Sequence, residues 1–155
     1  MAAIAAVVAL GVSALSMLYL ARQTKAAAEQ AKISNAVAAV SANDMVLRSL
    51  REVHTLMLQH PGSRRCFYDS MPLPTETGRR DAIVTIAELL ADVLTSGIHV
   101  HRNIPGSASA EAWEDYCRSV LVSSPVLRDL VRTHSAWWPY LSALLPVNQP
   151  GPAAC

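Results

Sequence analysis

The sequence predicts an all-α protein: an N-terminal transmembrane helix continues into a long stalk or core helix and is followed by a compact bundle of three or four shorter helices. Three observations support this fold class. No charged residue or histidine precedes Arg22, no proline precedes Pro61, and no later pair of segments alternates as paired β-strands do. The predicted division is a membrane anchor (1–21), a juxtamembrane stalk or core helix (22–59), a helical domain (60–145) and a disordered tail (146–155).

The composition indicates one strongly hydrophobic segment attached to a domain of typical soluble composition. Hydrophobic residues make up 52% of the 155-residue chain and charged residues 16%, against roughly a quarter charged in typical soluble proteins. Charged residues are absent before Arg22 and are spread fairly evenly after it. The net charge of +1 and the lack of a basic run argue against a nucleic-acid partner.

The uncharged stretch 2–21 has the length of a membrane-spanning helix, since a bilayer core requires about 20 apolar residues. A cleaved signal peptide is the alternative. It requires a positively charged start and small residues at the cleavage site, whereas this stretch starts uncharged and has the bulky residues Leu18, Tyr19 and Leu20 near its end. The sequence therefore favours an anchor in the lipid bilayer.

The charges that follow the span predict its orientation. Arg22, Lys25 and Lys32 lie directly after it, and Tyr19 stands where an interfacial aromatic residue is expected. The positive-inside rule then places the N-terminus outside the cell membrane and the domain in the cytoplasm. Tyr19, Arg22 and Lys25 are the predicted membrane-flanking residues.

The stretch 22–59 is predicted to be helical because it contains neither proline nor glycine. It carries a seam with alternating spacings of three and four residues, typical of a coiled coil: Ile33, Ala36, Val40, Asn43, Leu47, Leu50, His54 and Met57. Two interpretations remain open. The second half is the first core helix of the domain, or the seam pairs with a second copy through Ile33, Val40, Leu47 and Leu50.

The rest of the domain is predicted from local start and stop signals. His60-Pro61-Gly62 ends the long helix. Thr75 or Thr77 is expected to cap the next helix, which runs to about Ser96 and ends at Gly97. The loose alternation over 98–104 is compatible with an extended segment. A turn at Pro105 and Gly106, with a cap at Ser107 or Ser109, precedes a helix over about 110–122. A short helix follows Ser124-Pro125, and a last element contains Trp137 to Leu145.

No motif indicates a catalytic or metal site. His99 and His101 are the only close pair of histidines, whereas structural zinc normally uses close pairs at both ends of the site. Glu88 and Asp92 lie opposite the apolar face of their helix, which indicates a solvated surface. The chain also lacks nucleophile, phosphate-loop and dinucleotide motifs. We therefore expect no catalysis, no metal and no cofactor.

The aromatic residues are the best candidates for partner contact. Trp137, Trp138 and Tyr140 lie within four positions. Adjacent helical residues point about 100° apart, so one tryptophan is expected to pack with Trp113 and Tyr116 while the other lies near the surface. Exposed aromatic residues often contact protein partners. The predicted partner-contact residues are Trp113, Trp137, Trp138 and Tyr140.

Several short motifs carry a family resemblance: 42–50 (ANDMVLRSL), 60–61 (HP), 67–69 (FYD), 87–92 (AELLAD) and 137–139 (WWP). With them the chain resembles the small, uncharacterised, membrane-anchored helical proteins of actinobacteria, similar to the group named domain of unknown function 6082. The resemblance implies the same architecture and a membrane location, and it implies no functional residue.

Three functions are expected from these observations, in order of preference. The first is a membrane-tethered protein-interaction or regulatory module whose protein partner is unknown. The second is a small-ligand sensor or an enzyme with an unrecognised site, which predicts a pocket near Tyr68, His99 and Tyr116. The third is a homo-oligomeric membrane scaffold built through the stalk.

Overall fold

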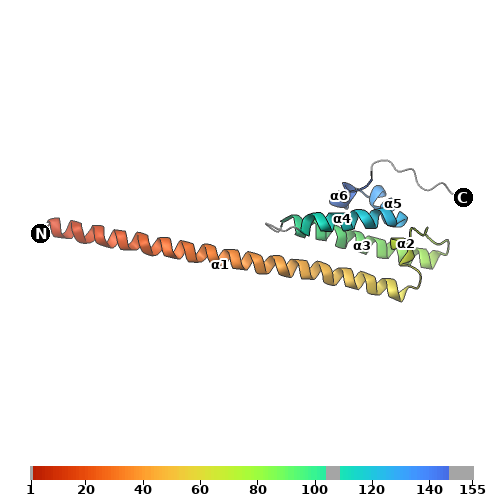
Figure 1. The fold of residues 1–155 in the computed structure, drawn as a ribbon, viewed down its shortest axis with the longest axis horizontal. Helices are drawn as coiled ribbons and strands as arrows, with labels where there is room; N and C mark the ends of the chain where they lie inside the picture. Colours follow the sequence, from red (N-terminus) through yellow and green to blue (C-terminus); the bar gives the residue numbers. More distant parts are fainter. Residues whose placement is uncertain (1, 104–108, 147–155) are drawn as a thin grey trace. The chain divides into compact units, whose positions relative to one another are not determined.

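The structure is a computed structural model that describes residues 2–103 and 109–146, with the side chains of 2–9 and Ser109 outside the description. Every regular element among the described residues is a helix, which confirms the all-α prediction. In the described part of the chain the long helix is followed by five shorter helices, and not by the predicted three or four. In chain order these are α1 (Ala2–Gln59), α2 (Arg65–Tyr68), α3 (Thr77–Asn103), α4 (Ser109–Ser123), α5 (Pro125–Thr133) and α6 (Pro139–Ser142) (Figure 1).

The chain divides into two compact units, Met1–Ser41 and Ala42–Cys155. The first unit is the start of α1, and nearly all of its described side chains are exposed. The second unit begins inside α1 because the end of this helix contributes to the domain core through Val46, Val53 and Met57. The boundary therefore falls within the predicted stalk or core helix.

Helix α3 forms the centre of the domain and packs against α4, α5 and α6 (Figure 1). Its buried residues recur every three or four positions and form the wide apolar face expected from the sequence: Ile83, Ile86, Ala87, Leu90, Ala91, Leu94 and Ile98. Burial of this face against several helices supplies the main hydrophobic stabilisation of the domain.

Two predicted boundaries are correct because local signals decide them. Helix α1 ends at Gln59, directly before His60-Pro61-Gly62, and Gly62 adopts a positive φ of 83° that favours glycine. Helix α5 begins at Pro125, with Ser124 as its N-cap accepting a hydrogen bond from the Leu127 amide at 3.2 Å. The same hydroxyl donates to the Cys66 carbonyl at 3.0 Å and so joins α5 to α2.

The predicted end of α3 at Gly97 is wrong, as is the predicted extended segment after it. The helix continues without interruption to Asn103. Gly97 lies against the indole of Trp113, and a Cβ atom added at Gly97 would overlap that ring. The glycine therefore allows α4 to approach α3 closely instead of ending the helix. The predicted turn at Pro105 and Gly106 and the cap at Ser107 lie outside the described residues.

One helix among the residues searched, α3, is long and apolar enough to cross a membrane by length and composition. Half of its most apolar stretch is buried inside the domain, as is also usual for the core helix of a soluble protein. Residues 10–59 of α1 form no comparable apolar stretch. Because the predicted anchor includes side chains outside the description, the anchor stays a prediction. The predicted tail, from residue 147 onward, also lies outside the described residues.

Candidate functional site

The two adjacent tryptophans before α6 have opposite environments. The Trp138 side chain is 4% exposed and belongs to the core, whereas the Trp137 side chain is 63% exposed. The indole N–H of Trp138 donates to Asp92 Oδ1 of α3 at 2.7 Å. This bond fixes Trp138 on α3 and thereby directs its neighbour outward. One tryptophan is therefore buried and the other lies at the surface, as expected. Among the described residues, the recorded partners of the buried Trp138 side chain are Asp92 and Trp137, and not the expected Trp113 and Tyr116.

The exposed indole of Trp137 is supported on two sides. It stacks on the His134 ring at a centroid distance of 4.3 Å and an interplanar angle of 20°. It also meets Trp138 edge to face at 5.6 Å. The Trp137 backbone amide donates to the His134 carbonyl at 2.9 Å, which closes the turn between the two residues. A large apolar ring is therefore held at the surface in one orientation.

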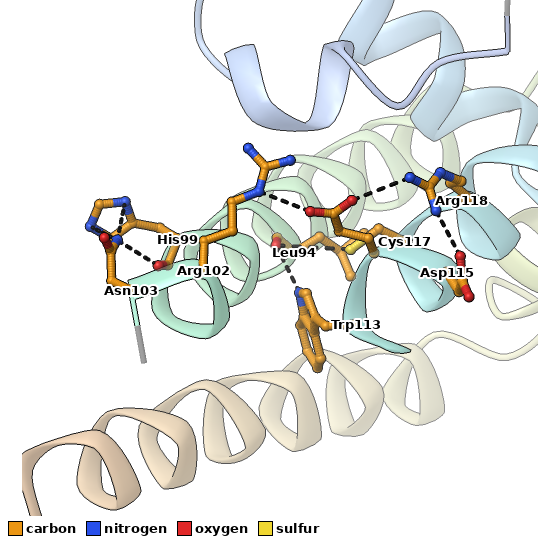
Figure 2. Close-up of polar contacts among 9 residues, drawn as sticks. Leu94, His99, Arg102, Asn103, Trp113, Asp115, Cys117 and Arg118 are labelled. Atoms are coloured by element: carbon orange, nitrogen blue, oxygen red, sulfur yellow. Dashed lines mark hydrogen bonds and ion pairs between the residues drawn. The ribbon is translucent and has the colours of Figure 1, made fainter. Parts of the chain in front are cut away.

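Tyr140, in the first turn of α6, is also exposed, at 40%. The Arg102 guanidinium carbon lies 5.4 Å from the centre of its ring, and the His99 ring lies 6.1 Å away. Arg102 in turn bonds Glu114 Oε1 at 2.8 Å, which links the end of α3 to α4. Figure 2 shows His99 and Arg102 together on this end of α3. We refer to these two ring pairs, Trp137 with His134 and Tyr140 with His99, together as the aromatic surface.

Trp113, another predicted contact residue, lies in the core. Its indole N–H donates to the Leu94 carbonyl of α3 at 3.2 Å (Figure 2). Its ring stacks on the buried His101 at 5.2 Å and lies 5.6 Å from Tyr116. Because Trp113 and Trp138 are both buried, the predicted contact set is reduced to Trp137 and Tyr140.

A chain of hydrogen bonds joins α1, α2 and α4 through three polar rings. His54 Nε2 and the Tyr68 hydroxyl are 2.8 Å apart, and the Tyr68 and Tyr116 hydroxyls are 3.2 Å apart. Burial, with a smaller contribution from the Arg64 charge, lowers the pKa of His54 below 6.5. Burial and the hydrogen bond with Tyr68 raise the pKa of Tyr116. Both shifts favour the neutral forms of His54 and Tyr116, and the two hydrogen bonds link the three helices.

The predicted ligand pocket near Tyr68, His99 and Tyr116 is only partly assembled. Tyr68 and Tyr116 are bonded to each other, but His99 lies beside Tyr140, and its backbone carbonyl accepts a bond from the Asn103 side chain at 2.8 Å. The described residues contain no group of three metal-ligating side chains. His99 and His101 therefore lie on one helix without further ligands gathered around them in the described part of the chain.

The described thiols are buried and free, and their environment suppresses ionisation. Burial raises the pKa of Cys117 to about 12, with a further contribution from the Glu114 charge. Burial also raises the pKa of Cys66, against opposing effects of Arg79 and Arg65. A thiol acts as a nucleophile only as its thiolate, so neither group is activated for covalent chemistry.

The predicted self-association seam is split between the two units. Ile33 and Val40, in the first unit, are 57% and 70% exposed. Leu47 and Leu50, in the second unit, pack against the core of their own domain. The second half of the seam therefore pairs within the chain. The predicted membrane-flanking residues Tyr19, Arg22 and Lys25 are all exposed on α1.

The described domain also contains surface cavities. A groove of about 370 Å³ lies between the α1 and α3 parts of the domain, lined mainly by apolar residues such as Met45, Val46, Val93 and Val100. A pocket of about 380 Å³ lies between α2 and the start of α3 and is lined by Arg65 and Arg79 among others. Sequence reasoning missed this pocket, because the two arginines are separated by a loop with no recognisable motif.

No family model matches the chain, and no curated protein or solved structure matches it either. The resemblance to small membrane-anchored actinobacterial proteins therefore stays a prediction.

Proposed function

We propose that this protein is a membrane-tethered protein-interaction module without catalytic activity, which presents the aromatic surface to a protein partner. The observation that carries the proposal is the exposed indole of Trp137, held by stacking on His134 while Trp138 fixes the turn to Asp92. Exposure of so large an apolar ring is unfavourable in water. Tryptophan and tyrosine are also the side chains that most often dominate binding energy at interfaces.

The start of α1 provides the evidence for the proposed membrane anchor. The uncharged stretch 2–21 is followed by Arg22 and Lys25, and helix α1 continues from Ala2 to Gln59. We propose that this stretch spans the cell membrane once, with the N-terminus outside and the domain in the cytoplasm. Tethering confines the domain near other membrane proteins, so it increases the effective concentration of a membrane-bound partner. The resemblance to membrane-anchored actinobacterial proteins supports the same proposal.

The test is crosslinked affinity capture of the full-length protein from its native membrane, with quantitative mass spectrometry. The variant Trp137→Ala removes the exposed ring and leaves the Trp138–Asp92 bond in place. The matched control is Leu58→Ala, because Leu58 is 78% exposed on a different helix. We expect a partner that the control retains and Trp137→Ala loses. Retention of every captured protein by both variants would eliminate the aromatic surface as the binding site.

A second candidate function, a homo-oligomeric scaffold, is favoured by a different surface. Ile33, Val37 and Val40 are exposed and share one face of α1, since they are separated by four and three residues. Such a row can pair with the same row of a second copy. Sedimentation of the detergent-solubilised protein tests this proposal. An oligomer that Val40→Asp dissociates would support the scaffold, and a monomer at all concentrations would eliminate it.

A further inference from the structure

The pocket between α2 and α3 combines two guanidinium groups with an apolar wall. It is about 380 Å³ in volume, within the range of small-ligand sites. Arg65 comes from α2 and Arg79 from the first turn of α3, and Thr75 also lines the pocket. The apolar part is formed by residues that include Met71, Leu73 and Ile83.

The Arg79 side chain is held in position by the turn that follows α1. Its Nη2 donates to the Pro61 carbonyl at 2.8 Å, and its guanidinium lies so close to Gly62 that a Cβ atom there would collide with it. A guanidinium has five N–H donors, so most of them remain for another acceptor. Among the described residues no carboxylate forms an ion pair with Arg79. Arg65 is 4.0 Å from Asp69, in an exposed pair that contributes little.

The electrostatics of this region favour an anion. Burial raises the pKa of the Cys66 thiol, and the charges of Arg79 and Arg65 oppose this effect. Cys66 lines the same pocket, so both positive charges lie near the pocket. The first turn of helix α3 contains Arg79 and Arg80 and no acidic residue, while Glu76 directly precedes the helix and Asp81 follows Arg80. Neither carboxylate forms a recorded ion pair with Arg79 among the described residues. Basic residues at a helix N-terminus are unfavourable, because they add to the positive end of the helix dipole. An anion bound between the arginines would offset this cost.

We propose that this pocket binds a phosphate monoester, with the phosphate between Arg65 and Arg79 and the organic group against Met71, Leu73 and Ile83. The planar guanidinium matches phosphate oxygens through paired hydrogen bonds, and two such groups balance a dianion. The apolar wall favours an ester over free phosphate, because only an ester has an organic group that can pack against this wall. A soluble phosphorylated metabolite and a phosphatidic acid headgroup share this chemistry. The site is independent of the aromatic surface.

The test is calorimetric titration of the full-length, detergent-solubilised protein with phenyl phosphate at constant ionic strength. Loss of one charge-assisted contact is expected to weaken binding about tenfold or more in Arg65→Gln and in Arg79→Gln. The matched control is Arg80→Gln, which removes the same charge one residue along α3 from a side chain outside the pocket lining. Because Arg79→Gln also removes a bond to Pro61, Arg65→Gln provides the independent variant.

The proposal would be overturned if neither phenyl phosphate nor the lipid binds. It would also be overturned if Arg80→Gln weakens binding as much as Arg65→Gln does. A second titration with short-chain phosphatidic acid in the same detergent distinguishes the two sources. Tighter, Arg65-dependent binding of the lipid supports the proposal with a membrane source. Tighter, Arg65-dependent binding of phenyl phosphate supports it with a soluble source.

Discussion

Trp138 and Asp92 are joined by a hydrogen bond of 2.7 Å between the indole N–H and a carboxylate oxygen. The sequence pattern places Asp92 on the solvated face of α3, and its side chain is indeed exposed. The carboxylate nevertheless accepts the polar hydrogen of a tryptophan that is otherwise in the core. This bond fixes the turn before α6 on α3 and determines which of the adjacent tryptophans faces outward.

Removal of this carboxylate is expected to destabilise the domain. Asp92→Ala leaves the Trp138 N–H without its acceptor, and hydrogen bonds to charged groups contribute about 1.5–3 kcal/mol. Asp92→Asn keeps an acceptor and should lose less. The free energy of unfolding from denaturant titration measures both effects. The matched control is Glu88→Ala, one helical turn away, and an equal loss in that variant would show that the Trp138 bond is not responsible.

Glycine substitutions in α3 should have opposite effects at two positions. Gly97→Ala places a Cβ atom in the space of the Trp113 indole, and overpacking of a core costs about 1–3 kcal/mol. Gly78→Ala meets no neighbouring atom, and alanine is more favourable than glycine in a helix by up to about 1 kcal/mol. Thermal unfolding of the two variants tests this contrast. A stable Gly97→Ala protein would contradict the described packing of Trp113.

The domain should lose stability as the pH falls below about 6.5. Burial and then the Arg64 charge lower the pKa of His54, and burial lowers the pKa of His101. The unfolded chain therefore binds more protons than the folded chain between the lowered pKa and the unfolded value of 6.5. The stability contributed by the neutral histidines is complete above pH 6.5 and is lost as the pH falls below this value. Unfolding free energies between pH 5 and 8 should have a shallower slope in His54→Gln; an unchanged slope would exclude His54 as a source.

The proposed membrane topology predicts which positions a membrane-impermeant thiol reagent reaches in intact cells. Ala2→Cys lies at the outer end of the proposed span and should be labelled. Leu58→Cys is highly exposed on the domain, at 78% in the wild-type side chain, but should be labelled only after the membrane is permeabilised. Labelling of Leu58→Cys in intact cells would place the domain outside and reverse the proposed orientation.

The predictable features of this fold depend on neighbours in the sequence. The end of α1 at His60-Pro61-Gly62 and the start of α5 at Ser124-Pro125 are examples, because caps and proline act within a few residues. Gly97 was mispredicted because its role is decided by Trp113, which approaches it only after the chain has turned back as α4. The hydrogen bond between Asp92 and Trp138 could not be predicted for the same reason, because the two residues meet only in the folded chain. Arg65 and Arg79 likewise share a pocket only through the path of the intervening loop.

The seam on α1 shows a second limit of pattern analysis. The regular spacing from Ile33 to Met57 is compatible with pairing inside one chain or between two. Packing separates the two halves: Leu50 and Met57 contact the core of their own domain, whereas Ile33 and Val40 remain exposed. A periodic pattern therefore predicted an apolar face correctly, but it did not specify what covers that face.

The central claim is that Trp137 contacts a protein partner, and site-specific photocrosslinking in the native membrane tests it most directly. A photoreactive amino acid replaces Trp137 in one full-length variant and Leu58 in the other. The proposed function predicts a discrete crosslinked product to one protein from position 137 and none from position 58. The same product from both positions, or none from position 137, would contradict it.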